Sequence, residues 1–163
     1  MRKVILTMAL VSILGSAAWA QSSNEEMITR PNGVGMHIGA TTGMGVSYRY
    51  WPGKVGAQIN VFTNMNSDGR TTRIGGLLMR EFIDRERLTV FGYIGGVMNS
   101  DTRANDFGQP EQNRSVSIGF GPGLDIPLGK IFSISLMGGY GIYSLGDMPR
   151  TNFTGEATLL YNF

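Results

Sequence analysis

Residues 115–128 read SVSIGFGPGLDIPL, and this stretch shows most clearly how the chain folds. Every second residue from Val116 to Leu128 is apolar, and the residues between them are mostly serine and glycine. Successive side chains of a β-strand point to opposite faces of the sheet. The alternation therefore predicts a strand with one wholly apolar face and one face of small or polar side chains.

The same alternation recurs along the chain, and no segment shows a convincing helical period. It predicts strands near residues 34–41, 44–51, 55–62, 132–142 and 152–163. Residues 73–82 and 88–98 are also strand-like, but the pairs Gly75-Gly76 and Gly95-Gly96 blur their phase. A bulge is possible in either strand, so their facing stays open. The total is eight strands.

The connections between these strands alternate in length. Tight turns follow the second, fourth and sixth strands, at residues 52–53, 84–86 and 129–130. Longer polar connections are expected at residues 64–71, 99–113 and 144–150, and Thr42-Gly43 is the one short member of that second set. An even number of strands with short links predicts an all-β fold, an eight-stranded antiparallel up-and-down barrel over residues 33–163.

The composition of the two faces decides which one points inward. A soluble barrel of the lipocalin or streptavidin kind would show its polar face to water, but here that face is mainly glycine and serine with isolated charges. Glycine weakens strands and gives little solubility. Small residues do suit an eight-stranded interior, which is only just wide enough for side chains. We therefore expect a transmembrane barrel whose apolar face meets lipid.

The first twenty residues have the form of a secretory signal peptide. Arg2 and Lys3 precede an apolar stretch, and Ala18-Trp19-Ala20 matches a cleavage site. Residues 21–32 form a short polar lead-in, which we expect to lie in the periplasm. Without Arg2 and Lys3, the 14 basic residues become 14 − 2 = 12, equal to the 12 acidic ones. No basic excess then supports nucleic-acid binding.

Aromatic residues gather at strand ends that adjoin the tight turns. On the apolar phase they are Tyr48 and Tyr50 in the second strand, and Tyr161 and Phe163 in the eighth. If the tight turns are periplasmic, all four lie at one interface, as an aromatic girdle does. Both termini are then expected in the periplasm.

These features together resemble the small eight-stranded outer-membrane barrels of Gram-negative bacteria, the OmpA-like and OmpX-like group. The signal peptide, the eight strands and the terminal LLYNF carry the resemblance. It implies that Leu159, Tyr161 and Phe163 form the C-terminal signal read by the barrel-assembly machinery. It also implies an outer-membrane location, with lipid and lipopolysaccharide as surroundings.

Four ionisable residues are expected inside the barrel. His37 and Glu156 lie at similar depth on strands that close the barrel, and Arg49 and Asp125 both face inward toward the tight turns. Unpaired charges in so dry an interior are costly, so we expect the pairs His37–Glu156 and Arg49–Asp125. We favour the interpretation that these four residues form a polar network that fills the interior and fixes strand register, over a gate that responds to protons or ligands.

The longest polar connection is the candidate binding loop. It carries Asp101, Arg103, Asp106, Glu111 and Arg114, and loops on a rigid barrel commonly carry binding. The alternative is that this loop is only a solvated tip of the barrel and binds no ligand.

No catalytic constellation is expected. The chain has no cysteine, which excludes disulfides, cysteine-ligated zinc and thiol catalysis, and no Ser-His pair stands at a strand end. We therefore predict no enzymatic activity, no cofactor and no metal site. The expected role is structural or adhesive, through the loops. The alternatives are an accessory subunit with a protein partner in the outer membrane, or a small pore for passive permeation.

Overall fold

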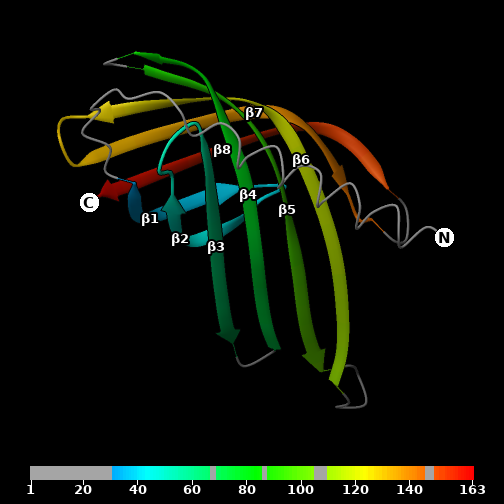
Figure 1. The fold of residues 1–163 in the computed structure, drawn as a ribbon. Helices are drawn as coiled ribbons and strands as arrows, with labels where there is room; N and C mark the ends of the chain where they lie inside the picture. Colours follow the sequence, from blue (N-terminus) through cyan, green and yellow to red (C-terminus); the bar gives the residue numbers. More distant parts are fainter. Residues whose placement is uncertain (1–30, 67–68, 86–87, 105–109, 146–148) are drawn as a thin grey trace.

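The chain forms a closed barrel of eight strands. The computed structural model describes residues 31–66, 69–85, 88–104, 110–145 and 149–163. Each strand pairs antiparallel with the next, and β8 pairs with β1 to close the barrel (Figure 1). The predicted all-β, eight-stranded antiparallel fold is confirmed. The expected signal peptide and most of the lead-in lie outside the described residues.

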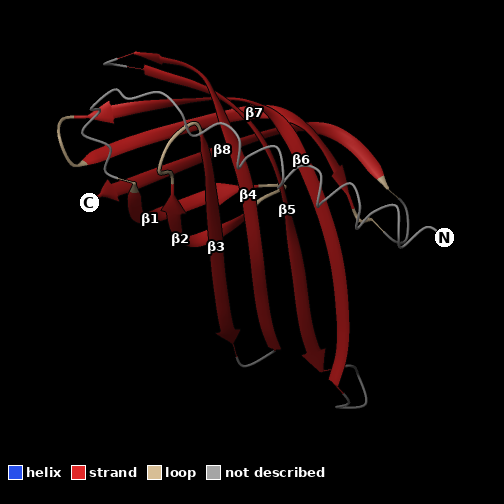
Figure 2. Ribbon diagram, viewed as in Figure 1, coloured by secondary structure: helices blue, strands red, loops and turns tan. Residues whose placement is uncertain are grey.

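The strands differ widely in length. They are β1 (Asn32–Gly39), β2 (Gly43–Tyr50), β3 (Val55–Asn66), β4 (Gly69–Arg85), β5 (Leu88–Ala104), β6 (Pro110–Leu128), β7 (Phe132–Tyr143) and β8 (Arg150–Asn162). Strands and their connections make up the whole of the described chain (Figure 2). A membrane-crossing helix, one long and apolar enough for that purpose, is absent from the described residues.

The structure assigns the facing of β4 and β5, which the sequence left open. Leu77 and Met79 of β4 and Phe91 and Tyr93 of β5 point inward and are buried. Their neighbours on the other phase, such as Leu78 and Ile94, are exposed. The register shifts between Glu81 and Ile83 rather than at either glycine pair, so the bulge lies near the turn. Both faces of these strands are apolar, which removes the period-two signal.

The interior of the barrel is therefore divided. The inward side chains of β4, β5 and β7 form an apolar cluster of Leu77, Met79, Phe91, Tyr93 and Met137, with Trp51 packed against it. The Trp51 and Phe91 rings meet edge to face, with centroids 5.3 Å apart. The buried inward side chains of β1 and β2 are polar, and those of β8 are polar except for Leu160. The expectation of an interior of glycine, serine and ions holds for one side of the lumen only.

Four strands continue past the end of the other four. Figure 1 shows β3, β4, β5 and β6 running on beyond the rest of the barrel, away from the C-terminus. Residues 62–66, 69–73, 99–104 and 110–115 form this extension, which we call the projecting sheet. The expected polar connections at 64–71 and 99–113 are thus mostly paired strand, and that prediction was wrong. Backbone pairing that begins inside the barrel continues outward because each added pair satisfies further N–H and C=O groups.

Candidate functional site: a plugged lumen beneath a projecting sheet

An apolar belt surrounds the barrel. The outward side chains of β6 show it best, because Ile118 and Leu124 are 38% and 39% exposed while Ser117 between them is buried. Large exposed apolar side chains lie on every strand of the barrel. A water-soluble monomer rarely exposes a continuous apolar surface of this size. A surface of this kind around a closed barrel is suited to hydrocarbon, where no backbone edge is left unpaired.

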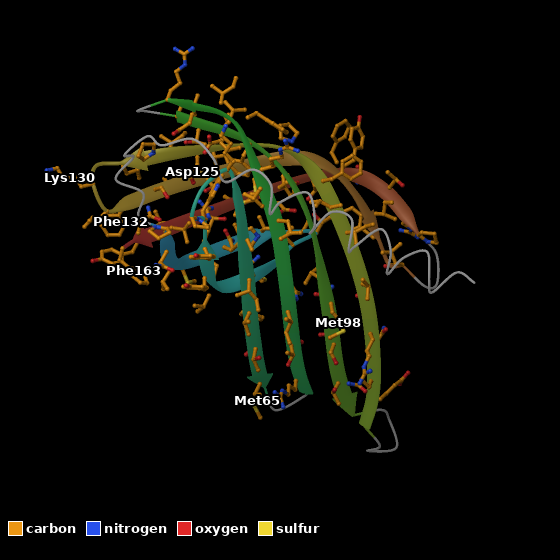
Figure 3. The ribbon with its side chains drawn as sticks, in the orientation of Figure 1. Met65, Met98, Asp125, Lys130, Phe132 and Phe163 are labelled. Atoms are coloured by element: carbon orange, nitrogen blue, oxygen red, sulfur yellow. The ribbon has the colours of Figure 1, made fainter. Side chains whose placement is uncertain are left out.

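Aromatic rings mark one end of this belt. Tyr48 and Tyr161 lie on either side of Val34 in the register, and both are exposed. The Tyr161 ring lies 5.6 Å from that of Phe132 and 6.3 Å from that of Phe163. Figure 3 shows Phe132 and Phe163 at the same end of the molecule as the turn residue Lys130. Tyr50 also lies on this outward phase and is exposed.

A second aromatic row, which the sequence analysis did not single out, lies toward the other end. Phe120, Tyr140 and Phe153 are register partners across β6, β7 and β8, and all three are exposed. Tyr140 follows Phe132 by 140 − 132 = 8 residues on β7. Eight residues span about 26 Å along a strand. Strands of membrane barrels tilt by about 40°, so this length corresponds to about 20 Å along the membrane normal, and both aromatic rows fit within an apolar band of roughly 25 Å.

Arg49 is the centre of the polar network in the half of the lumen near the tight turns. Its Nη1 donates to Asp125 Oδ1 at 2.8 Å and its Nε donates to Gln58 Oε1 at 3.1 Å. Its Nη2 donates to Ser135, whose hydroxyl in turn donates to Asp125. The guanidinium also lies 5.5 Å from the centre of the Trp51 ring. The structure thus brings Arg49 and Asp125 together.

Glu156 is the centre of the network in the other half. The hydroxyls of Thr41 and Thr42 donate to its two carboxylate oxygens, and the Thr154 hydroxyl donates to it at 3.3 Å. His37 Nε2 lies 3.8 Å from Glu156 Oε2. The same nitrogen lies 2.7 Å from Thr42 Oγ1, and His37 Nδ1 lies 2.7 Å from Thr158 Oγ1. His37 and Glu156 are therefore neighbours that share a threonine partner.

Two amides join the halves into one network. Gln58 Nε2 donates to Asn60 Oδ1 at 2.8 Å, and Asn60 Nδ2 donates to the Thr42 carbonyl oxygen at 2.9 Å. A chain of hydrogen bonds thus runs from Asp125 to Glu156 along the polar side of the lumen. The sequence analysis did not single out Gln58 and Asn60. The period-two alternation of residues 55–62 was the signal that could have found them, because it puts both on the polar phase.

The turn between β1 and β2 folds into the barrel instead of outward. The connection is short, as expected for Thr42-Gly43, and Thr41 and Thr42 are fully buried. Inward glycines make the room: a Cβ on Gly119 would lie 2.1 Å from Thr41 Oγ1, and one on Gly75 would lie 2.0 Å from the Thr42 carbonyl oxygen. We call residues 41–42 the plug, because they fill the lumen that these glycines leave open.

The expected binding loop is largely strand. Arg103 pairs with Glu111, Asp101 pairs with Asn113, and Arg114 pairs with Ser100, all in the ladder of β5 and β6. Asp106 lies outside the described residues. The four described residues therefore lie on a paired sheet beyond the barrel, and not in a mobile loop.

Among the described residues, the projecting sheet has two open edges. β2 pairs with β3 only as far as Val61, and no other described strand pairs with residues 62–66 of β3 on that side. β7 pairs with β6 only from Ile118 onward, and one further bond joins the Leu145 N–H to the Val116 carbonyl at 2.9 Å. Residues 110–115 of β6 therefore have an open edge as well. Open strand edges present backbone N–H and C=O groups that another extended chain can pair with.

No candidate for catalysis or metal binding emerges from the described residues. No group of three or more His, Asp or Glu side chains among them is placed to hold a metal ion. His37, the one histidine, is buried inside the barrel and bonded to threonines.

Solved structures with the same fold include two bacterial surface proteins. Neisserial surface protein A matches with a TM-score of 0.50 and 12% identity, covering 81% of this chain and 94% of its own. Ail, the attachment invasion locus protein of Yersinia pestis, matches in its complex with the heparin analogue sucrose octasulfate. The TM-score is 0.52 and the identity 20%, covering 81% of this chain and 95% of Ail.

At these identities the likeness shows the fold alone. No protein-family model matches the sequence, and no curated protein matches it. The chain has the fold of the small eight-stranded outer-membrane β-barrels of Gram-negative bacteria.

Proposed function

We propose that this protein is an outer-membrane barrel that binds an external protein partner through its projecting sheet. The observation that carries the proposal is that four strands run past the barrel and leave two open edges, on β3 and on β6. An extended segment of a partner adds to such an edge as a further strand. Hydrogen bonds between the two backbones then supply affinity, and every second side chain of the added strand contacts this protein and supplies specificity.

The projecting sheet is rigid enough to serve this purpose. β5 and β6 pair without a break from Met98 and Val116 out to Ala104 and Pro110, and β4 pairs with β5 to Gly69. A preformed edge loses little conformational freedom when a partner strand binds. Polar and charged side chains such as Arg70, Glu111 and Arg114 keep the exposed sheet soluble and limit pairing with the wrong strands.

The apolar belt supports the membrane placement. Residues 1–20 act in this proposal as a cleaved signal peptide, and Leu159, Tyr161 and Phe163 act as the signal for the barrel-assembly machinery. The C-terminus lies at the same end as the tight turns, which we place in the periplasm together with the N-terminus (Figure 3). The projecting sheet then extends outward from the cell. Ail is named for attachment and invasion, which is in keeping with a surface-binding role.

The plug argues against a pore for passive permeation. It closes the lumen with side chains whose polar groups are already bonded to Glu156, His37 and Asn60. The role that we propose is non-catalytic. An accessory subunit of a larger outer-membrane complex would use the same open edges, but toward a neighbour in the membrane.

Cells that display the protein provide the test. In a trimmed variant, residues 64–71 and residues 101–113 are each replaced by a two-residue Asn-Gly turn, which removes the outer parts of the β3–β4 and β5–β6 hairpins and most of both open edges. Cells with the intact protein are expected to adhere to immobilised extracellular-matrix proteins, and cells with the trimmed variant at equal surface density are expected to lose that adhesion. Equal adhesion by both would contradict the proposal. Crosslinking in intact cells to a resident outer-membrane protein would instead favour the accessory subunit.

A further inference from the structure

The outer face of the projecting sheet continues the lipid-facing belt in ordered rows. Ile74, Met98 and Val116 are register partners at the edge of the belt. One step outward on the same face, the row is Thr72, Ser100 and Arg114, and the next row is Arg70, Thr102 and Gln112. Same-face residues on a strand are about 6.6 Å apart. Arg114 therefore lies about 7 Å beyond the last apolar row, and Arg70 about 13 Å.

The two faces of this sheet differ in charge. On the inward phase, Asp101 and Glu111 are balanced by Arg73 and Arg103. The outer-face side chains that the structure describes carry no acid and two arginines: they are Thr63, Met65, Arg70, Thr72, Ser100, Thr102, Gln112 and Arg114. The outer face is therefore positive where it leaves the hydrocarbon.

Neither arginine forms an ion pair with another residue that the structure describes. Among the described residues, basic and acidic side chains lie within 4 Å of each other at His37–Glu156 and Arg49–Asp125, both inside the barrel. Arg114 Nη2 donates to Gln112 Oε1 at 3.1 Å, and Gln112 Nε2 donates to Ser100 Oγ at 3.0 Å. This arrangement positions the guanidinium beside hydroxyl groups without cancelling its charge. Arg70 is exposed on the same face.

We propose that this face binds the phosphate of an anionic lipid in the surrounding bilayer. The inference rests on the membrane placement proposed above. Headgroup phosphates lie within several ångströms of the hydrocarbon boundary, at the depth of Arg114. A guanidinium binds phosphate oxygens in a bidentate manner, and the hydroxyls of Thr72 and Ser100 donate further bonds. The lipid's acyl chains then lie along Ile74, Met98 and Val116, so one molecule contacts both parts of the face.

Spin-labelled lipids in vesicles test the proposal. The protein is inserted into phosphatidylcholine vesicles, and electron paramagnetic resonance measures how strongly it prefers labelled phosphatidic acid over labelled phosphatidylcholine. The wild type is expected to prefer phosphatidic acid. The double variant Arg70→Gln/Arg114→Gln is expected to lose most of that preference, since a cation near a headgroup contributes about fivefold. The matched variant Arg85→Gln/Lys130→Gln removes two exposed cations at the turn end and is expected to keep it.

The outcomes separate the two proposals. If wild type and Arg70→Gln/Arg114→Gln prefer phosphatidic acid equally, or if both double variants lose the preference equally, the lipid site is overturned. If sucrose octasulfate added in solution displaces the labelled phosphatidic acid from the wild type, the face serves a soluble polyanion, which also overturns it. If the wild type does not insert into phosphatidylcholine vesicles, the membrane placement fails, and the lipid site fails with it.

Discussion

Each charge inside the barrel is held by several partners. Arg49 contacts Asp125, Gln58 and Ser135, and Glu156 accepts bonds from Thr41, Thr42 and Thr154. Moving an ion into a dry interior is costly, and hydrogen bonds to the charged form offset that cost. The network therefore constrains which strands lie opposite one another.

Removing one partner of the Arg49–Asp125 pair leaves the other charge buried. Arg49→Met or Asp125→Met alone is expected to lower the free energy of unfolding by about 3–5 kcal/mol, while the double change is expected to cost much less. Urea unfolding of the folded protein in detergent micelles gives the three values. A double variant as damaged as either single one would mean that the two charges do not depend on each other.

The glycines around the plug give a second prediction. In Gly119→Ala the new Cβ lies 2.1 Å from Thr41 Oγ1, so the plug has to shift, and we expect a loss of about 1–3 kcal/mol. Gly155→Ala is the matched control, since nothing lies within 4 Å of the added Cβ. That control is expected to leave stability unchanged or to raise it by about 0.5 kcal/mol. Similar losses in both variants would argue against a tight fit of the plug.

The interior charges could be predicted from the sequence and the plug could not. His37, Arg49, Asp125 and Glu156 lie on the phase opposite to the apolar residues, and a closed barrel leaves that phase only the lumen. Nothing in a Thr-Thr-Gly turn says whether it folds inward. That depends on the space that Gly75, Gly95, Gly119 and Gly141 leave on four other strands, which only the assembled barrel shows.

Strand facing could be predicted where the two faces differ in polarity. β6 sets Ile118 and Phe120 against Ser117 and Gly119, and the structure follows that alternation. In β4, Leu78 points outward and Leu77 points inward, so the polarity of the residues does not show which face of the strand is which. The outer ends of the long strands were also missed, because polar residues satisfy a water-exposed ladder as readily as a loop.

The projecting sheet is expected to be separable from the barrel. The trimmed variant, with residues 64–71 and 101–113 each replaced by Asn-Gly, removes pairs outside the apolar belt and none of the side chains that the structure describes as buried. Its free energy of unfolding is expected to stay within about 0.5 kcal/mol of the wild type. Urea unfolding in micelles measures this value. A large loss would show that the sheet supports the barrel and that its removal is no clean test of binding.

The barrel as a whole is expected to be closed to ions. The plug and the apolar cluster around Phe91 fill the lumen from its two sides. The wild type should give no steady conductance in planar bilayers. Thr41→Gly/Thr42→Gly, which removes the plug side chains but keeps the turn, should give reproducible small steps. Steps from the wild type, or silence from the variant, would contradict the assigned role of the plug.

The central claim is that apolar side chains face lipid and polar ones face the lumen. The chain contains no cysteine, so single cysteines carrying nitroxide labels can be placed along residues 116–124 of β6 in vesicles. The accessibility of each label to oxygen, which concentrates in hydrocarbon, is then measured by electron paramagnetic resonance. The account predicts maxima at 116, 118, 120, 122 and 124 and minima at the odd positions between them. Maxima at the odd positions, or no alternation, would contradict it.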